Sequence, residues 1–169
     1  MKEVFEGKTV SVVGNARSLF DSKYGKEIDT AEIVCRIKRG FFMLKPQDLV
    51  SHGNRTDVWF LNWFKTMNPN RMTSKTCDHI VEILHHPAID AEWLKADLGH
   101  HRPSTGLRIL HLISLYNPKT VNVYGFDWKK TPSFHDKKMI DERHNFALEE
   151  DYCHRRFFEK QKEVFKLKK

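Results

Sequence analysis

The chain has 169 residues, a formal net charge of +7 and a pI of about 9.3. This length suits one domain, residues 1–169, and the 40% hydrophobic residues suffice for a core without metal or disulfide support. No run reaches the roughly 18 apolar residues that a membrane span needs, and charges near the N-terminus argue against a signal peptide. Three widely spaced cysteines, without metal-ligand spacing, predict a reduced, cytoplasmic protein.

Three short β-branched or aromatic runs predict buried strands in the first part of the chain, each next to turn residues. These runs are Thr9–Val13, Glu32–Ile37 and Asp57–Leu61. The apolar residues within Cys77–His86, a segment that stops before Pro87, predict a helix.

The second half of the chain begins with its clearest helix start. Ser104 or Thr105 can cap a helix with a leucine- and isoleucine-rich buried side, which ends at Asn117-Pro118. A fourth strand is predicted at Thr120–Tyr124, and residues from about 141 to 167 predict one or two long helices. The lysine-rich end would then be a solvated helix end, or a surface that binds polyanions.

Alternating short apolar strands and helices predict an α/β fold, with a single Rossmann-like, mostly parallel sheet flanked by helices. In such sheets, ligands bind beyond the carboxyl ends of the strands. The predicted ends are Gly14-Asn15, Leu61-Asn62 and Gly125-Phe126. We therefore expect the functional site there.

Three polar motifs could carry chemistry. The Gly14-Asn15 turn suits a nucleotide, and residues 103–106 (PSTG) suit a carboxylate or phosphate at a helix start. An ordinary turn and an ordinary helix cap are the alternatives. His144 could accept a proton near pH 7, but it is one of ten histidines. Glu149 lies five residues later, about 140° around a helix, so a contact between the two does not follow from spacing.

The order of these motifs resembles glycosyltransferase family 29, the sialyltransferases. Residues 10–40 (VSVVGNARSLFDSKYGKEIDTAEIVCRIKRG) resemble the family's large sialylmotif, and residues 53–62 (GNRTDVWFLN) resemble its continuation. Residues 102–128 (RPSTGLRILHLISLYNPKTVNVYGFDW) resemble the small sialylmotif. His135 lies near the third motif, and residues 144–149 match the very small motif, His-x4-Glu.

This resemblance implies a variant GT-A fold and an inverting, metal-independent transfer of a sugar from a nucleotide donor, first of all a CMP-linked one. It implies no cofactor besides this co-substrate, and the sequence has no Asp-x-Asp motif to bind a divalent ion. His144 would be the general base that activates the acceptor hydroxyl. Six residues would bind the donor's nucleotide, phosphate or sugar carboxylate: Asn15, Ser104, Thr105, Gly106, Gly125 and His135.

The sequence also departs from the family. Residues close to Val10 and Tyr116 stand where the family has a disulfide, and Lys38, followed by Arg39, stands where it has an asparagine. The second change leaves the donor sugar open. The chain is also much shorter than a Golgi enzyme with its anchor and stem, so we expect a minimal soluble bacterial or viral member.

Three functions are compatible with these features. A saccharide acceptor is the family expectation. The basic charge keeps open the glycosylation of hydroxylated bases in viral DNA. A third hypothesis is a nucleotide- or nucleic-acid-binding module without catalysis.

Overall fold

The computed structural model describes residues 1–38, 43–62, 77–84, 86–89, 98, 102–134 and 144–168. The strands are β1 (Thr9–Val13), β2 (Ile33–Ile37), β3 (Val58–Leu61), β4 (His79–Glu82), β5 (Thr120–Tyr124) and β6 (Phe165–Lys168). The helices are α1 (Lys2–Phe5), η1 (Arg17–Asp21), α2 (Gly25–Thr30), η3 (Pro46–Asp48), α3 (Leu49–His52), α5 (Thr105–Ser114), α6 (Phe146–Cys153) and η6 (His154–Glu159).

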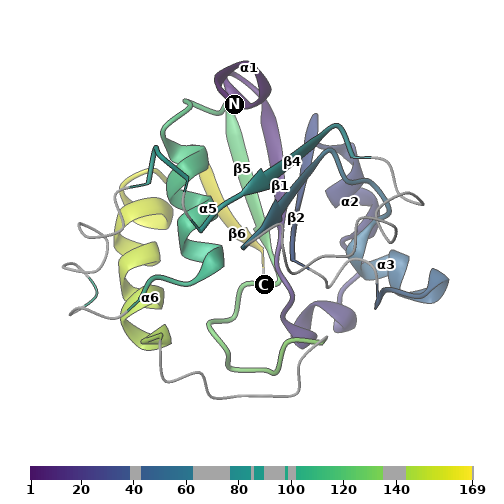
Figure 1. Cartoon of the computed structure of the whole chain (residues 1–169). Coiled ribbons are helices and arrows are strands. Elements are labelled where there is room, and N and C mark those ends of the chain that lie inside the picture. The colour runs from purple at the N-terminus through teal and green to yellow at the C-terminus, as the bar shows by residue number, and fades with distance from the viewer. Residues whose placement is uncertain are drawn as a thin grey trace.

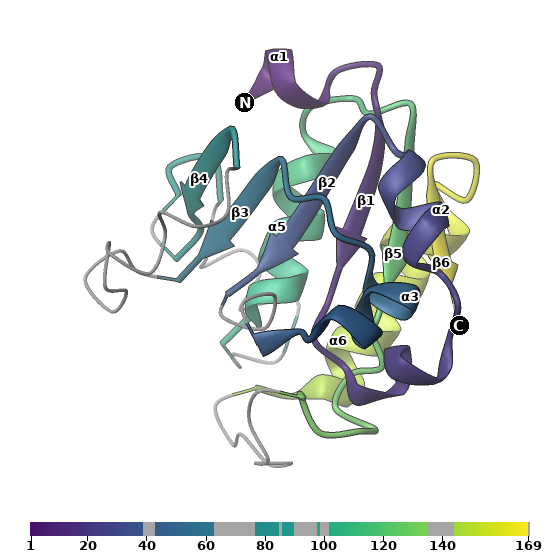
Figure 2. The same cartoon turned by 90° about the vertical axis from the view of Figure 1, so that its right-hand side faces the viewer.

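One six-stranded sheet has the order β4-β3-β2-β1-β5-β6, and every pair of neighbouring strands is parallel. Helices α5 and α6 cover one face, and α2 and α3 lie on the other (Figures 1 and 2). The chain builds outward from β1 to β4, then returns to add β5 and β6 on the opposite side of β1. The strand order therefore reverses between β1 and β5, where α/β sheets open a crevice for ligands. The predicted α/β class is confirmed.

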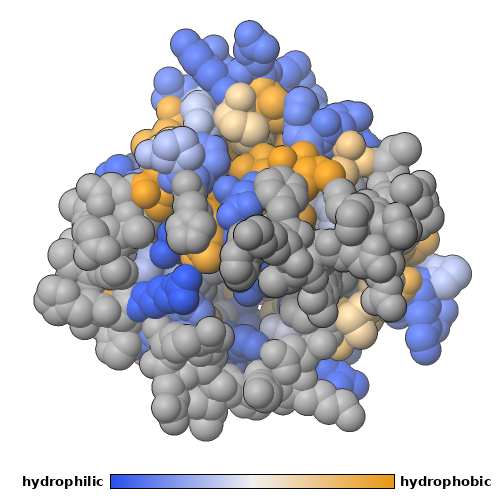
Figure 3. Space-filling view, viewed as in Figure 1, coloured by the Kyte–Doolittle hydropathy of each residue, from blue (hydrophilic) through white to orange (hydrophobic). Residues whose placement is uncertain are grey.

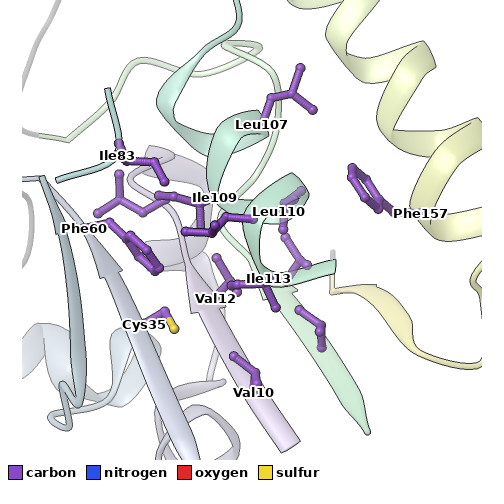
Figure 4. Packing of buried hydrophobic residues seen from close by; sticks show 14 of the residues in the cluster. Val10, Val12, Cys35, Phe60, Ile83, Leu107, Ile109, Leu110, Ile113 and Phe157 are labelled. Atoms are coloured by element: carbon purple, nitrogen blue, oxygen red, sulfur yellow. The ribbon is translucent and has the colours of Figure 1, made fainter. Parts of the chain in front are cut away.

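The main core lies between the sheet and α5 (Figure 4). Val12 of β1 and Phe60 of β3 are fully buried there, together with Ile109, Leu110 and Ile113 of α5. Their spacing along α5 places them on the side that faces the sheet. This packing fixes the N-terminus of α5 above the ends of the central strands.

The surface seen in Figure 3 is hydrophilic around α1, and hydrophobic side chains gather just below that helix. In the part of the chain that the structure describes, no helix is long and apolar enough to cross a membrane.

The strands predicted in the first half and at residues 120–124 are confirmed, but the helix predicted at Cys77–His86 is wrong. His79–Glu82 form strand β4, which pairs in parallel with β3. Its backbone continues the sheet, because the amide of Ile83 donates to the carbonyl oxygen of Leu61 (2.7 Å). A short apolar run is compatible with a buried strand as well as with a helix. Here the segment forms a strand because it pairs with the edge of β3.

The long helices predicted between residues 141 and 167 are also wrong over their last part. Helix α6 ends at Cys153 and continues as the π-helix η6, and the chain then forms strand β6. Phe165 is buried and Leu167 packs against the core, while Lys166 between them is exposed. The lysine-rich end is therefore an edge strand beside β5, and its alternation has the period of a strand.

His52, at the end of α3, is a buried titratable group with 1% of its surface exposed. Its ring lies 4.4 Å from that of Phe20 and 5.4 Å from that of Phe134. Nδ1 lies 2.7 Å from Ser51 Oγ, and Nε2 has no hydrogen-bond partner among the residues that the structure describes. Burial, followed by the nearby Arg36 cation, lowers the pKa of His52 to about 4.

The depressed pKa of His52 predicts acid sensitivity. Between about pH 6.5 and 4 the unfolded chain binds a proton that the folded chain does not, so stability falls as the pH falls. We expect this residue to contribute a slope of at most about 1.4 kcal/mol per pH unit. The free energy of unfolding in urea is measured from pH 7 to 4 for His52→Phe and for the wild type. The difference between the two curves gives the slope that His52 contributes. Parallel curves would contradict the prediction.

Candidate active site

Strands β1 and β5 approach each other closely where they end. The amide of Gly14 donates to the carbonyl oxygen of Tyr124 (2.7 Å), and that of Ala16 donates to the carbonyl oxygen of Gly125 (3.2 Å). A Cβ at position 14 would lie 2.3 Å from that Gly125 oxygen. Gly125 itself has φ +63°, in the left-handed region that favours glycine. The two glycines therefore join the strand ends at the crossover point of the sheet.

We expect Gly14→Ala to destabilise the protein by about 3 kcal/mol or more, because a backbone oxygen of the central sheet would have to move. Gly7→Ala is the matched control. Its Cβ meets nothing within 4 Å, so only the backbone strain at φ +68°, about 1–2 kcal/mol, applies. Urea unfolding compares the two, and an equal or smaller loss in Gly14→Ala would rule out the close approach as the cause.

A cavity of about 250 Å³ opens at these strand ends. Its walls come from the ends of β1, β2 and β5, the N-terminus of α5, one side of α6 and the loop after β5. Six residues predicted from the sequence line this cavity: Asn15, Ser104, Thr105, Gly106, Gly125 and His144. The seventh, His135, lies outside the described residues.

Asn15 is fixed by the neighbouring strand. Its Nδ2 donates to the carbonyl oxygen of Ile37 at the end of β2 (3.0 Å). Asn15 lines the cavity, and with Nδ2 bound to β2 the other end of its amide group is an oxygen that can only accept. The amide thus has one orientation before any ligand binds.

The start of α5 uses both of its hydroxyl groups within the fold. Ser104 Oγ accepts from the amide of Leu107 (3.3 Å) and is the N-cap. Thr105 Oγ1 donates to Oδ1 of Asn62, just after β3 (2.6 Å). Gly106 allows Phe126 to pack closely, since a Cβ there would lie 2.7 Å from Phe126 Cε1. The helix therefore presents its first turn, with its positive dipole end, to the cavity.

Glu149 of α6, and His144 just before the N-cap of that helix, approach the same helix start. His144 Nδ1 lies 2.5 Å from the carbonyl oxygen of Arg102, and because a carbonyl only accepts, Nδ1 carries the hydrogen. In the neutral ring the lone pair is then on Nε2. Glu149 Oε1 accepts from the amide of Ser104 (2.6 Å) and lies 4.0 Å from His144 Nδ1.

This contact could not be inferred from helical spacing. Helix α6 begins at Phe146 with Asn145 as its N-cap, so His144 lies outside the helix and turns back toward Glu149. Glu149 is only 2% exposed. Burial raises its pKa to about 7, although its hydrogen bonds from Ser104 and the charge of Arg108 act in the opposite direction.

Sequence reasoning missed the loop after β5 as a source of site residues. Asp127, Trp128, Lys129, Thr131 and Ser133 all line the cavity. The segment holds no regular pattern, and only its turn-forming residues set it apart in the sequence. Its contribution follows from contacts with the distant end of β1.

The family model of glycosyltransferase family 29 (sialyltransferase) matches residues 6–101, more than half of the chain. The chain belongs to glycosyltransferase family 29. It is therefore a glycosyltransferase. A search among curated proteins found no significant match.

Solved structures agree with this family 29 assignment at the level of the fold. A mammalian sialyltransferase in complex with Gal-beta-1-3GalNAc-ortho-nitrophenol has a TM-score of 0.66 and 18% sequence identity, with 99% of this chain and 71% of that chain covered. A second structure of a mammalian sialyltransferase has the same TM-score and identity, with 96% and 69% covered. The predicted sialyltransferase-like fold is thus confirmed.

The departure from the family 29 pattern at Lys38 lies within the cavity. Lys38 follows β2 directly and has φ +53°. Its amide donates to the carbonyl oxygen of Phe60 (2.8 Å), and its carbonyl accepts from Nε1 of Trp59 (2.6 Å). A lysine therefore lines the cavity at the position that resembles the family's asparagine.

Two further features of the described residues concern the surroundings of this cavity. Among them, no group of three or more His, Cys, Asp or Glu side chains is placed to hold a metal ion. A second cavity, of about 310 Å³, lies on the other side of the loop after β5 and shares residues 125–128 with the first. The second cavity is the larger of these two, but Asn15, Ser104 and His144 line the first and not the second, so the first is the candidate site.

Proposed function

We propose that this glycosyltransferase moves a sugar from a CMP-linked donor to an acceptor hydroxyl, with inversion at the anomeric carbon, without a metal ion, and with His144 as general base. One observation carries the proposal. The His144 ring, with Nδ1 directed at the carbonyl oxygen of Arg102, lines the same cavity as Asn15 and the start of α5. A proton acceptor and two groups that suit a nucleotide thus share one small cavity.

The chemical step follows from the tautomer of His144. Nε2 takes the proton of the acceptor hydroxyl while that oxygen attacks the anomeric carbon and forms the new bond. The bond from the anomeric carbon to the phosphate oxygen breaks, and its electron pair leaves with the nucleotide. The carbonyl of Arg102 and the carboxyl group of Glu149 stabilise the imidazolium that results. Helix-end N–H groups and His135 would stabilise the departing phosphate in place of a metal ion.

A donor panel tests the proposal. The protein is incubated with CMP-linked and UDP-linked sugars and a panel of saccharide acceptors, and the released nucleotide is measured with and without EDTA. We expect release from a CMP-linked sugar, dependent on acceptor and unchanged by EDTA. Release only from UDP-linked donors would overturn the CMP assignment, and loss of release with EDTA would overturn metal independence. Donor binding without any turnover would favour a binding module.

A DNA acceptor is a second candidate, and the net charge of +7 favours it. Binding of this kind must weaken steeply with salt, because counterions are released from the phosphates. Titration of duplex DNA containing hydroxymethylated bases, at graded salt, tests it. Absence of binding at low salt would exclude DNA as the acceptor.

A further inference from the structure

Lys129 lies in the wall of the proposed donor cavity, one residue beyond the segment that resembles the small sialylmotif. Its Nζ donates to Oγ of Ser133 (2.9 Å), and both residues line the cavity. The side chain is half-buried. An ammonium group has three N–H donors, and the bond to Ser133 takes one of them and fixes where the group lies.

The loop that carries Lys129 is held by one carboxylate. Asp127 accepts from the amide of Lys129 (3.1 Å), the amide of Thr131 (3.0 Å), the hydroxyl of Ser18 (3.2 Å) and the hydroxyl of Thr131. Trp128 and Lys129 have φ +50° and +65°. This left-handed backbone costs about 1–2 kcal/mol for each such residue, and it persists where surrounding contacts require it.

The same loop is attached to the end of β1. Arg17 donates its amide to the carbonyl oxygen of Pro132 (3.0 Å), and Phe134 donates its amide to that of Asn15 (3.0 Å). Ala16 and Ser133 form an isolated antiparallel bridge. The position of the Lys129 cation is therefore set relative to Asn15.

The charges around the cavity suit an anion. Two lysines, Lys38 and Lys129, are among the residues that line it, and the N-terminus of α5 adds its dipole. Two carboxyl groups, those of Asp127 and Glu149, also line the cavity. Asp127 is engaged in hydrogen bonds that hold the loop. Glu149 is buried, and its pKa of about 7 keeps a large share of it neutral near pH 7.

We propose that Lys129, oriented by Ser133, is a ligand of the nucleotide phosphate in the donor. The inference rests on the proposed function, because the phosphate belongs to the nucleotide-sugar. As the bond to the anomeric carbon breaks, the phosphate oxygen gains its electron pair, and Nζ donates to the charge that develops there. Lys129 keeps its proton throughout, since the proton of the acceptor goes to His144.

Nucleotide and nucleoside affinities test the assignment. Calorimetric titration of the whole chain with CMP, UMP, cytidine and uridine is compared for the wild type and Lys129→Asn. Asparagine tolerates the left-handed backbone, so this variant removes the charge with little strain. We expect CMP and UMP to bind roughly 10- to 100-fold more weakly, because a charge-assisted hydrogen bond is lost. Cytidine and uridine should bind with unchanged affinity.

Two further variants separate charge from loop structure. Lys129→Arg keeps the cation and should retain most of the affinity for CMP. Lys119→Met removes the same charge from an exposed turn before β5 and should leave the affinity unchanged. Equal losses for nucleotide and nucleoside in Lys129→Asn would assign Lys129 to loop structure alone. An unchanged CMP affinity in that variant, or a wild type that binds neither nucleotide, would overturn the inference.

Turnover distinguishes this inference from the function on which it rests. If the wild type binds CMP through Lys129 and transfers no sugar, the phosphate ligand stands and the proposed function fails. If the wild type transfers sugar and Lys129→Asn binds CMP normally, the inference alone fails.

Discussion

His144→Ala should lower the kcat of sugar transfer by roughly 10²- to 10⁴-fold while the affinity for CMP stays within a few-fold of the wild type. The base is lost, whereas Asn15 and the start of α5, which would hold the nucleotide, are held by their own hydrogen bonds to Ile37 and Leu107. Initial rates with a saturating donor give kcat, and calorimetry gives the dissociation constant for CMP.

His79→Ala is the matched control for this prediction, because His79 is exposed on the edge strand β4. It should leave kcat and CMP affinity unchanged. If His144→Ala retained turnover close to the wild type, His144 would not be the base. If it lost CMP affinity as strongly as turnover, the residue would act in binding.

Glu149→Gln should raise stability at pH 8 and lower activity. The pKa of Glu149 is higher in the folded chain than in the unfolded chain, about 7 against 4.5. Its contribution to stability is therefore complete below pH 4.5 and is lost as the pH rises through 7. Glutamine keeps an acceptor for the amide of Ser104 and carries no charge, so we expect a gain of up to about 3 kcal/mol at pH 8 relative to pH 4.5.

The activity of Glu149→Gln tests the role of the carboxylate beside His144. Glutamine cannot supply the negative charge 4.0 Å from Nδ1, so kcat should fall about 10-fold at pH 8, where the wild-type group is ionised. Stability curves for variant and wild type are compared at each pH, because the slope from His52 runs in the opposite direction over much of the window. A constant difference between pH 4.5 and 8 would show that Glu149 is not a buried acid.

The central strands could be predicted from the sequence and the edge strands could not, for a physical reason. Strands β1 and β2 are almost entirely buried, so continuous apolar runs identify them. Only Val81 of β4 is buried, and the short segment gives no period that excludes a helix. In β6, the alternation from Phe165 to Lys168 was a usable signal, which the lysine-rich composition obscured.

The candidate site could be predicted where a strand end or a helix cap carries it, as at Asn15 and Ser104. Their functional meaning came from the order of the motifs and not from the residues alone. The contact between His144 and Glu149 depends on where α6 begins, a boundary that sequence patterns place only within a few residues. The position of Lys129 depends on a loop without a regular pattern, which Asp127 holds from within and links to the distant Ser18.

The parallel pairing of β1 with β5, in which Val10 lies beside Val121, also determines when the cavity can form. During synthesis, β1 can join β2 long before residues 120–124 leave the ribosome, and contacts this distant in sequence form late. A nascent chain arrested before β5 would carry Asn15 but neither Gly125 nor the loop of Lys129. We expect such a chain to bind no nucleotide. The capacity to bind nucleotide would then appear abruptly as β5 emerges from the ribosome.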